Sequence, residues 1–475
     1  MTDSKAGLRR SLGFWTAFAV VVGTVIGSGI FLVPSDMIRA VGSPGMVFAV
    51  WIFGGVLTMF GALTYAELSA AMPEAGGEYV YLNAAYGPLA GFIQGWMNTW
   101  VGFSASIAAK AAALYTYLGD FFPGLNGVVY SVALPIGPGG GPLEIRHGQL
   151  LGIVVIVFLV GVNYVGVRVG GGVQVAVTAL KVALIAGIIV AGLLSRNGNT
   201  SNYHTLMPAN MGGIAGFFAA LVAALWAYDG WNNAGMIGAD VERPGRNLPR
   251  VLILGTAAVI GIYLLTNLAY FYLLSAPEAG SSARVAADAM RRAVGSSGGA
   301  IVSLAAIISI FASLNGSFIA GSRAPYAMAR GGYFFPSMGR VHPRFYTPGP
   351  SLILIGAWSS LLLLSGRFED LYRMVIFTEW IFYAMAAGAV IVLRRKRPEM
   401  NRPYRVLGYP LVPILFVLVA VGLLYSTLIT YPRESGIGLA LIVAGLPFYF
   451  HWKRAAERTR SGPQSGGTGG IPLGV

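Results

Sequence analysis

The chain contains no cysteine, and charged residues make up only 11% of its 475 positions. The absence of cysteine excludes a disulfide framework, a thiolate metal site and a catalytic thiol. The scarcity of charge accompanies a hydrophobic content of 56% and a mean hydropathy of +0.68. Because a soluble domain of this size cannot hide that much apolar surface, the composition predicts a polytopic protein of the lipid bilayer.

The few ionisable residues also lack the groupings that other functions need. The net charge is +14, but the basic residues lie between hydrophobic segments rather than on one exposed domain, which argues against a nucleic-acid partner. The histidines fall in loops or at span ends and form no HExxH motif; they are His147, His204, His342 and His451. The sequence therefore predicts neither an enzyme nor a bound metal or cofactor.

Runs of about 20 apolar residues predict twelve membrane-spanning helices and an all-α fold. The predicted spans lie near residues 12–39, 45–71, 87–118, 149–168, 173–194, 213–238, 250–275, 296–328, 349–365, 371–394, 408–431 and 436–453. A short segment, 1–11, precedes them. A glycine-rich tail, 461–475, follows them and is predicted to be disordered.

Lysine and arginine are distributed unevenly between the two sides of the predicted bundle. If the N-terminus is cytoplasmic, the inner segments hold 21 of these residues, and the outer segments and span ends hold nine. This bias predicts a multi-pass protein of the inner (plasma) membrane with both termini in the cytoplasm.

Two of the predicted spans contain glycine-rich or polar interruptions, GTVIGSGIF (Gly23–Phe31) and WAYDGWNN (Trp226–Asn233). Irregular backbone persists at membrane depth only where it lines a cavity or is buried in protein, and paired interruptions indicate a transporter's substrate site. A half-helix that restarts near Ile30 would present free N–H groups to a carboxylate. The alternative is helix packing, since Gly23 and Gly27 also form a GxxxG pattern.

The second interruption places a carboxylate, Asp229, in the middle of an apolar run. A carboxylate at the bilayer centre costs about 2.5–3.5 kcal/mol on insertion scales, so it normally faces a wet cavity or a partner. Backbone carbonyls freed here suit an ammonium group, so we expect a zwitterion to bind between the two breaks. The alternative for Asp229 is a permanent pair with a lysine.

Two lysines also lie inside predicted spans. Lys181 is central in the fifth span, so we expect it to face the bundle interior, where its ammonium would replace a sodium ion and tether the broken first helix, or would carry a proton. Lys110 lies nearer the outer end of the third span, where snorkelling or a structural pair is expected.

Several motifs, in order along the chain, resemble the LAT-like (L-type) amino acid transporters of the amino acid-polyamine-organocation (APC) superfamily, in a bacterial form. The matching stretches are GTVIGSGIF, YAELSAAMPEAGGEYVYL (65–82), LKVALI around Lys181, LWAYDGWNNAGMIGADVERPGRNLPR (225–250), SLNGSFIAGSR (313–323) with VHPRFYTPGPSL, and the tryptophan and LRRKRPEMNRPYRV of 380–406. They cover most of residues 12–406.

The resemblance implies a LeuT-type fold with two inverted repeats of five helices, 12–194 and 213–394, and two added helices in 408–453. It implies that the substrate carboxylate binds at Ser28, Gly29 and Ile30, with Val25 and Ile26 beside it. It also implies that the amino group binds carbonyls of Trp226, Ala227 and Asp229. Trp226 would act as an aromatic gate, and Lys181 would take the place of sodium.

The chain departs from the family pattern at two points. Many relatives carry a small residue where this chain has Asp229, which leaves open whether cationic side chains are accepted. Eukaryotic members pair through a disulfide with a single-span glycoprotein, and a chain without cysteine cannot do so. We therefore expect a transporter that works without this heavy chain; its oligomeric state stays open.

The resulting prediction is a sodium-independent L-amino acid exchanger that works by alternating access. A proton-coupled symporter is the alternative, and a non-transporting amino acid receptor is a further one. A channel would need a pore-lining ring of charges or carbonyls, which the asymmetric breaks do not suggest.

Overall fold

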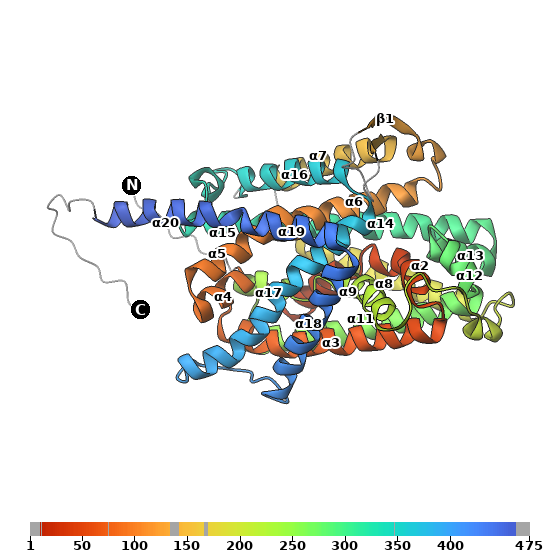
Figure 1. The fold of residues 1–475 in the computed structure, drawn as a ribbon, viewed down its shortest axis with the longest axis horizontal. Coiled ribbons are helices and arrows are strands. Elements are labelled where there is room, and N and C mark those ends of the chain that lie inside the picture. The colour runs from red at the N-terminus through yellow and green to blue at the C-terminus, as the bar shows by residue number, and fades with distance from the viewer. Residues whose placement is uncertain are drawn as a thin grey trace.

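The computed structural model describes residues 10, 12–74, 76–133, 142–165, 170–345 and 347–461. The predictions for segment 1–11 and for the tail lie almost wholly outside these residues. The described chain is an elongated bundle of helices (Figure 1). Helices α4, α15 and α20 lie toward one end of the bundle, and α2, α12, α13 and strand β1 lie toward the other.

The helices that form the bundle follow the predicted spans closely. They are α1 (Phe14–Val25), α2 (Gly29–Val41), α3 (Pro44–Ala71), α5 (Pro88–Met97), α6 (Phe103–Leu118), α7 (His147–Val165), α8 (Gly170–Leu193), α9 (Gly213–Tyr228), α10 (Asn233–Met236), α11 (Pro244–Leu273), α14 (Ser296–Gly321), α15 (Arg323–Arg330), α16 (Gly349–Ser365), α17 (Phe368–Lys396), α18 (Leu411–Thr430), α19 (Pro432–Val443) and α20 (Gly445–Ser461).

Shorter elements connect these helices. They are α4 (Glu78–Tyr86), α12 (Ala276–Ser281), α13 (Val285–Val294), the 3-10 turns Pro123–Asn126, Thr200–His204, Gly238–Asp240 and Pro336–Gly339, and a two-stranded antiparallel sheet of β1 (Val128–Val132) and β2 (Leu143–Arg146).

Ten helical segments among the described residues are long and apolar enough to cross a membrane, so the chain is a polytopic helical membrane protein. Two of the twelve predicted spans are not among these ten. Residues 349–365 form an apolar helix of 17 residues, and 87–118 runs through α5, a π-helical turn (Asn98–Gly102) and α6. The count of twelve and the inverted repeat stay predictions.

Large apolar side chains cover the outside of the bundle. Val154, Val157 and Phe158 of α7 and Leu418 and Val421 of α18 are each about 60% exposed, within a range of 56–63%. Patches of this kind are rare on soluble monomers but fit a surface surrounded by lipid.

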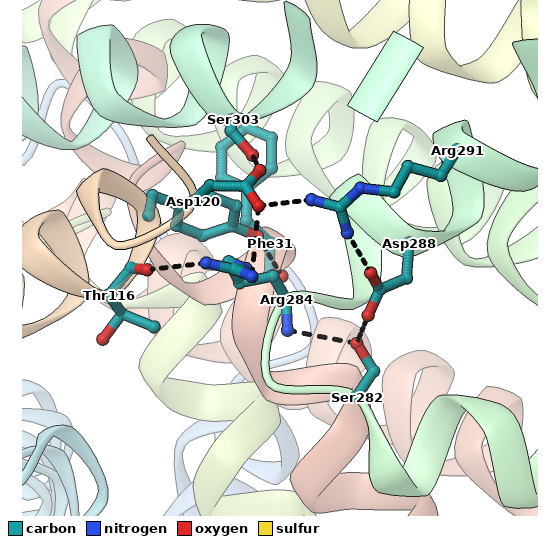
Figure 2. Close-up of polar contacts among 9 residues, drawn as sticks. Phe31, Thr116, Asp120, Ser282, Arg284, Asp288, Arg291 and Ser303 are labelled. Atoms are coloured by element: carbon teal, nitrogen blue, oxygen red, sulfur yellow. Dashed lines mark hydrogen bonds and ion pairs between the residues drawn. The ribbon is translucent and has the colours of Figure 1, made fainter. Parts of the chain in front are cut away.

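A network centred on Asp120, which follows α6, holds the end of the bundle that contains α12 and α13 (Figure 2). Its carboxylate pairs with Arg284, at 3.1 Å, and with Arg291, and accepts a hydrogen bond from Ser303 of α14. Arg291 also pairs with Asp288. The Asp120 network therefore ties the α12–α13 segment to α6 and α14.

Glu67, near the end of α3, is the centre of a second buried network. Its carboxylate accepts two hydrogen bonds from Arg394 of α17, at 2.9 and 2.6 Å, and one from the backbone N–H of Val406, at 2.7 Å. Arg402 lies 3.4 Å from the same carboxylate. A bidentate arginine pair has a defined geometry, so this network fixes the end of α17 and the following loop on α3.

Candidate functional site

The first helix is interrupted between Val25, where α1 ends, and Gly29, where α2 begins, as the sequence predicts. A helix that ends in the bundle interior leaves its last carbonyls without partners. Here side chains of other helices satisfy them. Lys181 Nζ of α8 donates to the carbonyls of Gly23 and Ile26, at 3.0 and 3.2 Å, so Lys181 faces the interior, as predicted.

Hydroxyl groups of other helices also contact the carbonyls at the end of α1. Ser313 of α14 donates to the carbonyl of Thr24 at 3.1 Å, and Ser309 donates to that of Ile26 at 3.3 Å. The Tyr263 hydroxyl of α11 lies 3.1 Å from the carbonyl of Val25. The carbonyls of residues 23, 24 and 26 therefore accept from side chains, and that of Val25 lies next to a hydroxyl, so an interruption at this depth is stabilised by other helices.

The other side of the first break has free donors. Among the described residues, the backbone N–H groups of Ser28, Gly29 and Ile30 have no hydrogen-bond acceptor. Gly29 packs directly on the second broken helix: a Cβ atom at this position would lie 2.4 Å from Cα of Ala227. The structure thus brings the predicted carboxylate-binding and amino-binding segments together.

The second interruption lies between Tyr228, where α9 ends, and Asn233, where α10 begins. Asp229 is extended, with ψ of 150°, and Gly230 has φ of +98°, a conformation that glycine adopts without strain. The carbonyl of Trp226 accepts from the N–H of Asp229, at 3.2 Å, and that of Ala227 accepts from Tyr263, at 2.9 Å. Each carbonyl keeps a second lone pair for an ammonium group.

The Trp226 side chain lies between the two breaks and a layer of aromatic rings. Its Nε1–H donates to Ser28 Oγ at 3.3 Å, and its ring lies 5.9 Å from the rings of both Phe368 and Tyr372. Two cavities of about 440 and 430 Å³ lie toward the α12–α13 end, with Tyr372 lining one and Phe368 the other. We call them the vestibule; both are also lined by Asp36, Arg39, Arg367 and Glu369.

Asp229 is part of a buried carboxyl pair that the sequence analysis did not identify. The hydroxyl of Tyr383 lies 3.0 Å from Asp229 Oδ1 and 3.0 Å from Glu379 Oε2. Both Tyr383 and Glu379 come from α17. Glu379 lies inside the predicted span 371–394, and a carboxyl group at that depth is costly unless it faces a polar cavity or a partner, as for Asp229.

Of the two expectations for Lys110, snorkelling or a structural pair, snorkelling was wrong. Its side chain is 8% exposed, and its ammonium donates to Ser317 of α14 at 2.7 Å. It lies in the interior because the face of α6 that carries it packs toward Ser317 and the Trp226 ring, whose centre is 6.0 Å from Lys110 Nζ. In the described part of the chain, neither Lys110 nor Asp229 forms an ion pair, so Asp229 is not permanently paired with a lysine.

Two small cavities, of about 20 and 10 Å³, lie among these residues. The smaller cavity is lined by residues of both breaks, among them Val25, Ser28, Gly29, Trp226 and Asp229. The larger is lined by Asp229, Glu379 and Tyr383, and Lys110 lines both. We call these two cavities the central site.

Three serines of α14 were also missed, although their spacing carries a signal; two of them, Ser309 and Ser313, donate to carbonyls of the first break, and the third, Ser317, accepts from Lys110. Ser309, Ser313 and Ser317 are spaced four residues apart, which places them on one face of a helix. A stripe of hydroxyls in an otherwise apolar span indicates a face that meets polar groups.

A polytopic helical bundle with two interrupted helices that meet at a buried polar site has the architecture of a membrane carrier. The chain belongs to the amino acid permease family, whose model matches residues 12–448. This family and the relatives below are transporters rather than enzymes.

Curated relatives match along almost the whole chain. The serine/threonine exchanger SteT of Bacillus subtilis (strain 168) is 34% identical over 94% of this chain and 98% of its own length. The human b(0,+)-type amino acid transporter 1 is 32% identical, over 94% of this chain and 89% of its own. The human cystine/glutamate transporter is 30% identical, over 94% and 86%. These likenesses favour exchange over the alternative functions.

Proposed function

We propose that this protein is a sodium-independent exchanger of L-amino acids that works by alternating access. The substrate carboxylate would accept hydrogen bonds from the N–H groups of Ser28, Gly29 and Ile30, beside Val25 and Ile26. The substrate ammonium group would bind the carbonyls of Trp226, Ala227 and Asp229. Opposite ends of two broken helices thereby complement the two charges of a zwitterion.

The position of Lys181 carries the sodium-independent part of this proposal. Its ammonium donates to the carbonyls of Gly23 and Ile26, which are hard oxygen ligands of the kind a sodium ion takes. A covalently attached cation there stabilises the break without a dissociable ion. Lys181 is 1% exposed and lines neither cavity of the vestibule.

Trp226 is the proposed gate between the central site and the vestibule. With Phe368 and Tyr372 it forms a continuous aromatic layer, and the vestibule begins beyond this layer. Movement of the broken helices with α3 and α11 against the remaining helices would open the site to either side in turn.

The basic residues of the loops favour an orientation with both termini in the cytoplasm, which puts the vestibule outside the cell. We propose that the protein works in the plasma membrane without a disulfide-linked heavy chain, because no cysteine is present to hold one.

The test is uptake of a radiolabelled amino acid panel into proteoliposomes, with and without unlabelled amino acid inside, at several external pH values. Uptake that requires internal substrate, and that ignores sodium and proton gradients, is the expected result. Uptake into empty vesicles driven by an inward proton gradient would instead establish the symporter. In that case Lys181 is the first candidate proton carrier.

A further inference from the structure

Lys110 has unused hydrogen-bonding capacity inside the bundle. An ammonium group carries three N–H donors, and within the described part of the chain Lys110 uses one, toward Ser317 Oγ at 2.7 Å. The side chain is more than nine-tenths buried, so water does not freely satisfy the other two. Leaving two N–H donors of a buried cation without acceptors is costly, and therefore the site calls for a further acceptor.

The unused donors lie at the central site. Lys110 lines the small cavity formed by Ser28, Gly29 and Trp226, and it also lines the adjoining cavity that extends to Glu379. Its Nζ atom lies 6.0 Å from the centre of the Trp226 ring. With the substrate's carboxylate and amino groups at the breaks, the adjoining cavity is the space that remains for the substrate's side chain.

This side-chain subsite presents groups of both signs. The ammonium of Lys110 donates, whereas the carboxyls of Asp229 and Glu379 accept. The other polar side chains of the lining are neutral: Asn98, Ser106, Asn232, Asn233, Ser317 and Tyr383. A cationic side chain would meet Lys110, and an anionic one would meet two carboxyls. A neutral group that both accepts and donates satisfies both sides.

We propose that Lys110 is a specificity-determining residue that hydrogen-bonds the side-chain oxygen of neutral hydroxyl or carboxamide amino acids. The oxygen accepts from Lys110, and the hydroxyl or amide hydrogen is donated to the carboxyl of Asp229 or Glu379. This inference rests on the proposed function, because it uses the same placement of the substrate backbone. Sites built to bind a hydroxyl discriminate strongly against the isostere that lacks it, since their buried polar groups are then left unpaired.

The test compares isosteric substrates in purified protein and proteoliposomes. Threonine is compared with valine, serine with 2-aminobutyrate, and asparagine with leucine, each as a competitor of labelled alanine exchange. The wild type is expected to prefer the polar member of each pair. In Lys110→Met we expect the polar member to lose roughly tenfold or more in apparent affinity, as for one hydrogen bond to a charged group, while its isostere changes little.

Two further variants isolate the role of Lys110. Ser317→Ala removes the group that orients the ammonium, so it should weaken the same preference by a smaller factor. Ser104→Ala is the control on α6, because Ser104 donates to the carbonyl of Thr99 and lines neither cavity. Thermal stability in detergent shows whether each variant folds, and Ser317→Ala provides the test if Lys110→Met does not.

Distinct outcomes would overturn the inference. Equal weakening of all substrates by Lys110→Met, rescued by Asp229→Asn, would make Lys110 only a counter-ion. Unchanged selectivity in Lys110→Met, or a wild type that treats threonine and valine alike, would also refute it. None of these results touches the proposed exchange function, which fails only if labelled alanine itself is not exchanged.

Discussion

The break after α1 and the break after α9 differ in the groups that complete their backbone hydrogen bonds. At the first, side chains of α8, α11 and α14 bind the freed carbonyls. At the second, the bonds are mainly local: Asp229 N–H donates to Trp226 O, Asn233 N–H donates to Gly230 O, and Gly230 supplies the positive φ. The first break thus depends on distant helices, and the second is largely encoded in its own sequence.

This difference suggests separate roles for the two segments in transport. A local turn keeps its shape when its helix moves, whereas a break held by three other helices can change only if those contacts change. We therefore expect substitutions around the first break to alter the transport cycle most, and substitutions at the second to act mainly on binding. Two contacts join the breaks: the Tyr263 hydroxyl, and the hydrogen bond from Trp226 to Ser28.

The largest effect should come from Gly29→Val. A Cβ atom at Gly29 would lie 2.4 Å from Cα and 2.5 Å from Cβ of Ala227, so the two breaks cannot keep their present separation. We expect loss of substrate binding and exchange, measured by radioligand binding and proteoliposome uptake. Gly261→Val on α11, where no atom lies within 4 Å, is the control and should stay active. Normal exchange by Gly29→Val would refute the placement of the substrate between the two breaks.

The next effect tests the long-range support of the first break. Lys181→Met removes two charge-assisted bonds to the carbonyls of Gly23 and Ile26. Each such bond contributes about 1.5–3 kcal/mol, so we expect the exchange rate to fall by at least roughly tenfold. The folded protein should still be recovered, with only a modest loss of thermal stability. The control is Thr178→Val on the same helix, which loses only a neutral bond to the carbonyl of Ala19. Equal exchange by Lys181→Met and Thr178→Val would contradict the role of Lys181 in holding the first break.

A smaller effect is expected where the two breaks are joined. Tyr263→Phe removes the hydroxyl that lies 3.1 Å from the carbonyl of Val25 and 2.9 Å from that of Ala227. Loss of one neutral hydrogen bond costs about 1 kcal/mol, which corresponds to a several-fold reduction in exchange. Tyr270→Phe is the matched control two turns along α11, because the hydroxyl of Tyr270 is buried without a partner. Equal exchange rates for Tyr263→Phe and Tyr270→Phe would show that the Tyr263 hydroxyl does not support exchange.

The sequence was sufficient to predict the broken helices because glycine and buried charge are local signals. GSG and YDG mark both interruptions to within about two residues, and Asp229 and Lys181 stand out in apolar runs. The partners of these groups could not be predicted, because Ser309, Ser313, Tyr263 and Tyr383 become neighbours only through helix packing. The facing of Lys110 could not be predicted for the same reason, because its contacts with Ser317 and Trp226 form only when α6 packs on α14 and α9.

The smallest effect concerns pH and the second break. Glu78 of α4, outside the ten candidate spans, accepts a hydrogen bond from Asn232 at 2.6 Å, and burial raises the pKa of Glu78 to about 7. Because its folded pKa exceeds the unfolded value of about 4.5, Glu78 lowers stability as pH rises between these values, and the loss levels off above about 7. Thermal unfolding of Glu78→Gln should therefore show a weaker decline in stability from pH 5 to 7 than the wild type shows. If Glu78→Gln shows the same decline as the wild type, other groups cause the decline, and the contact between Glu78 and Asn232 does not make stability depend on pH.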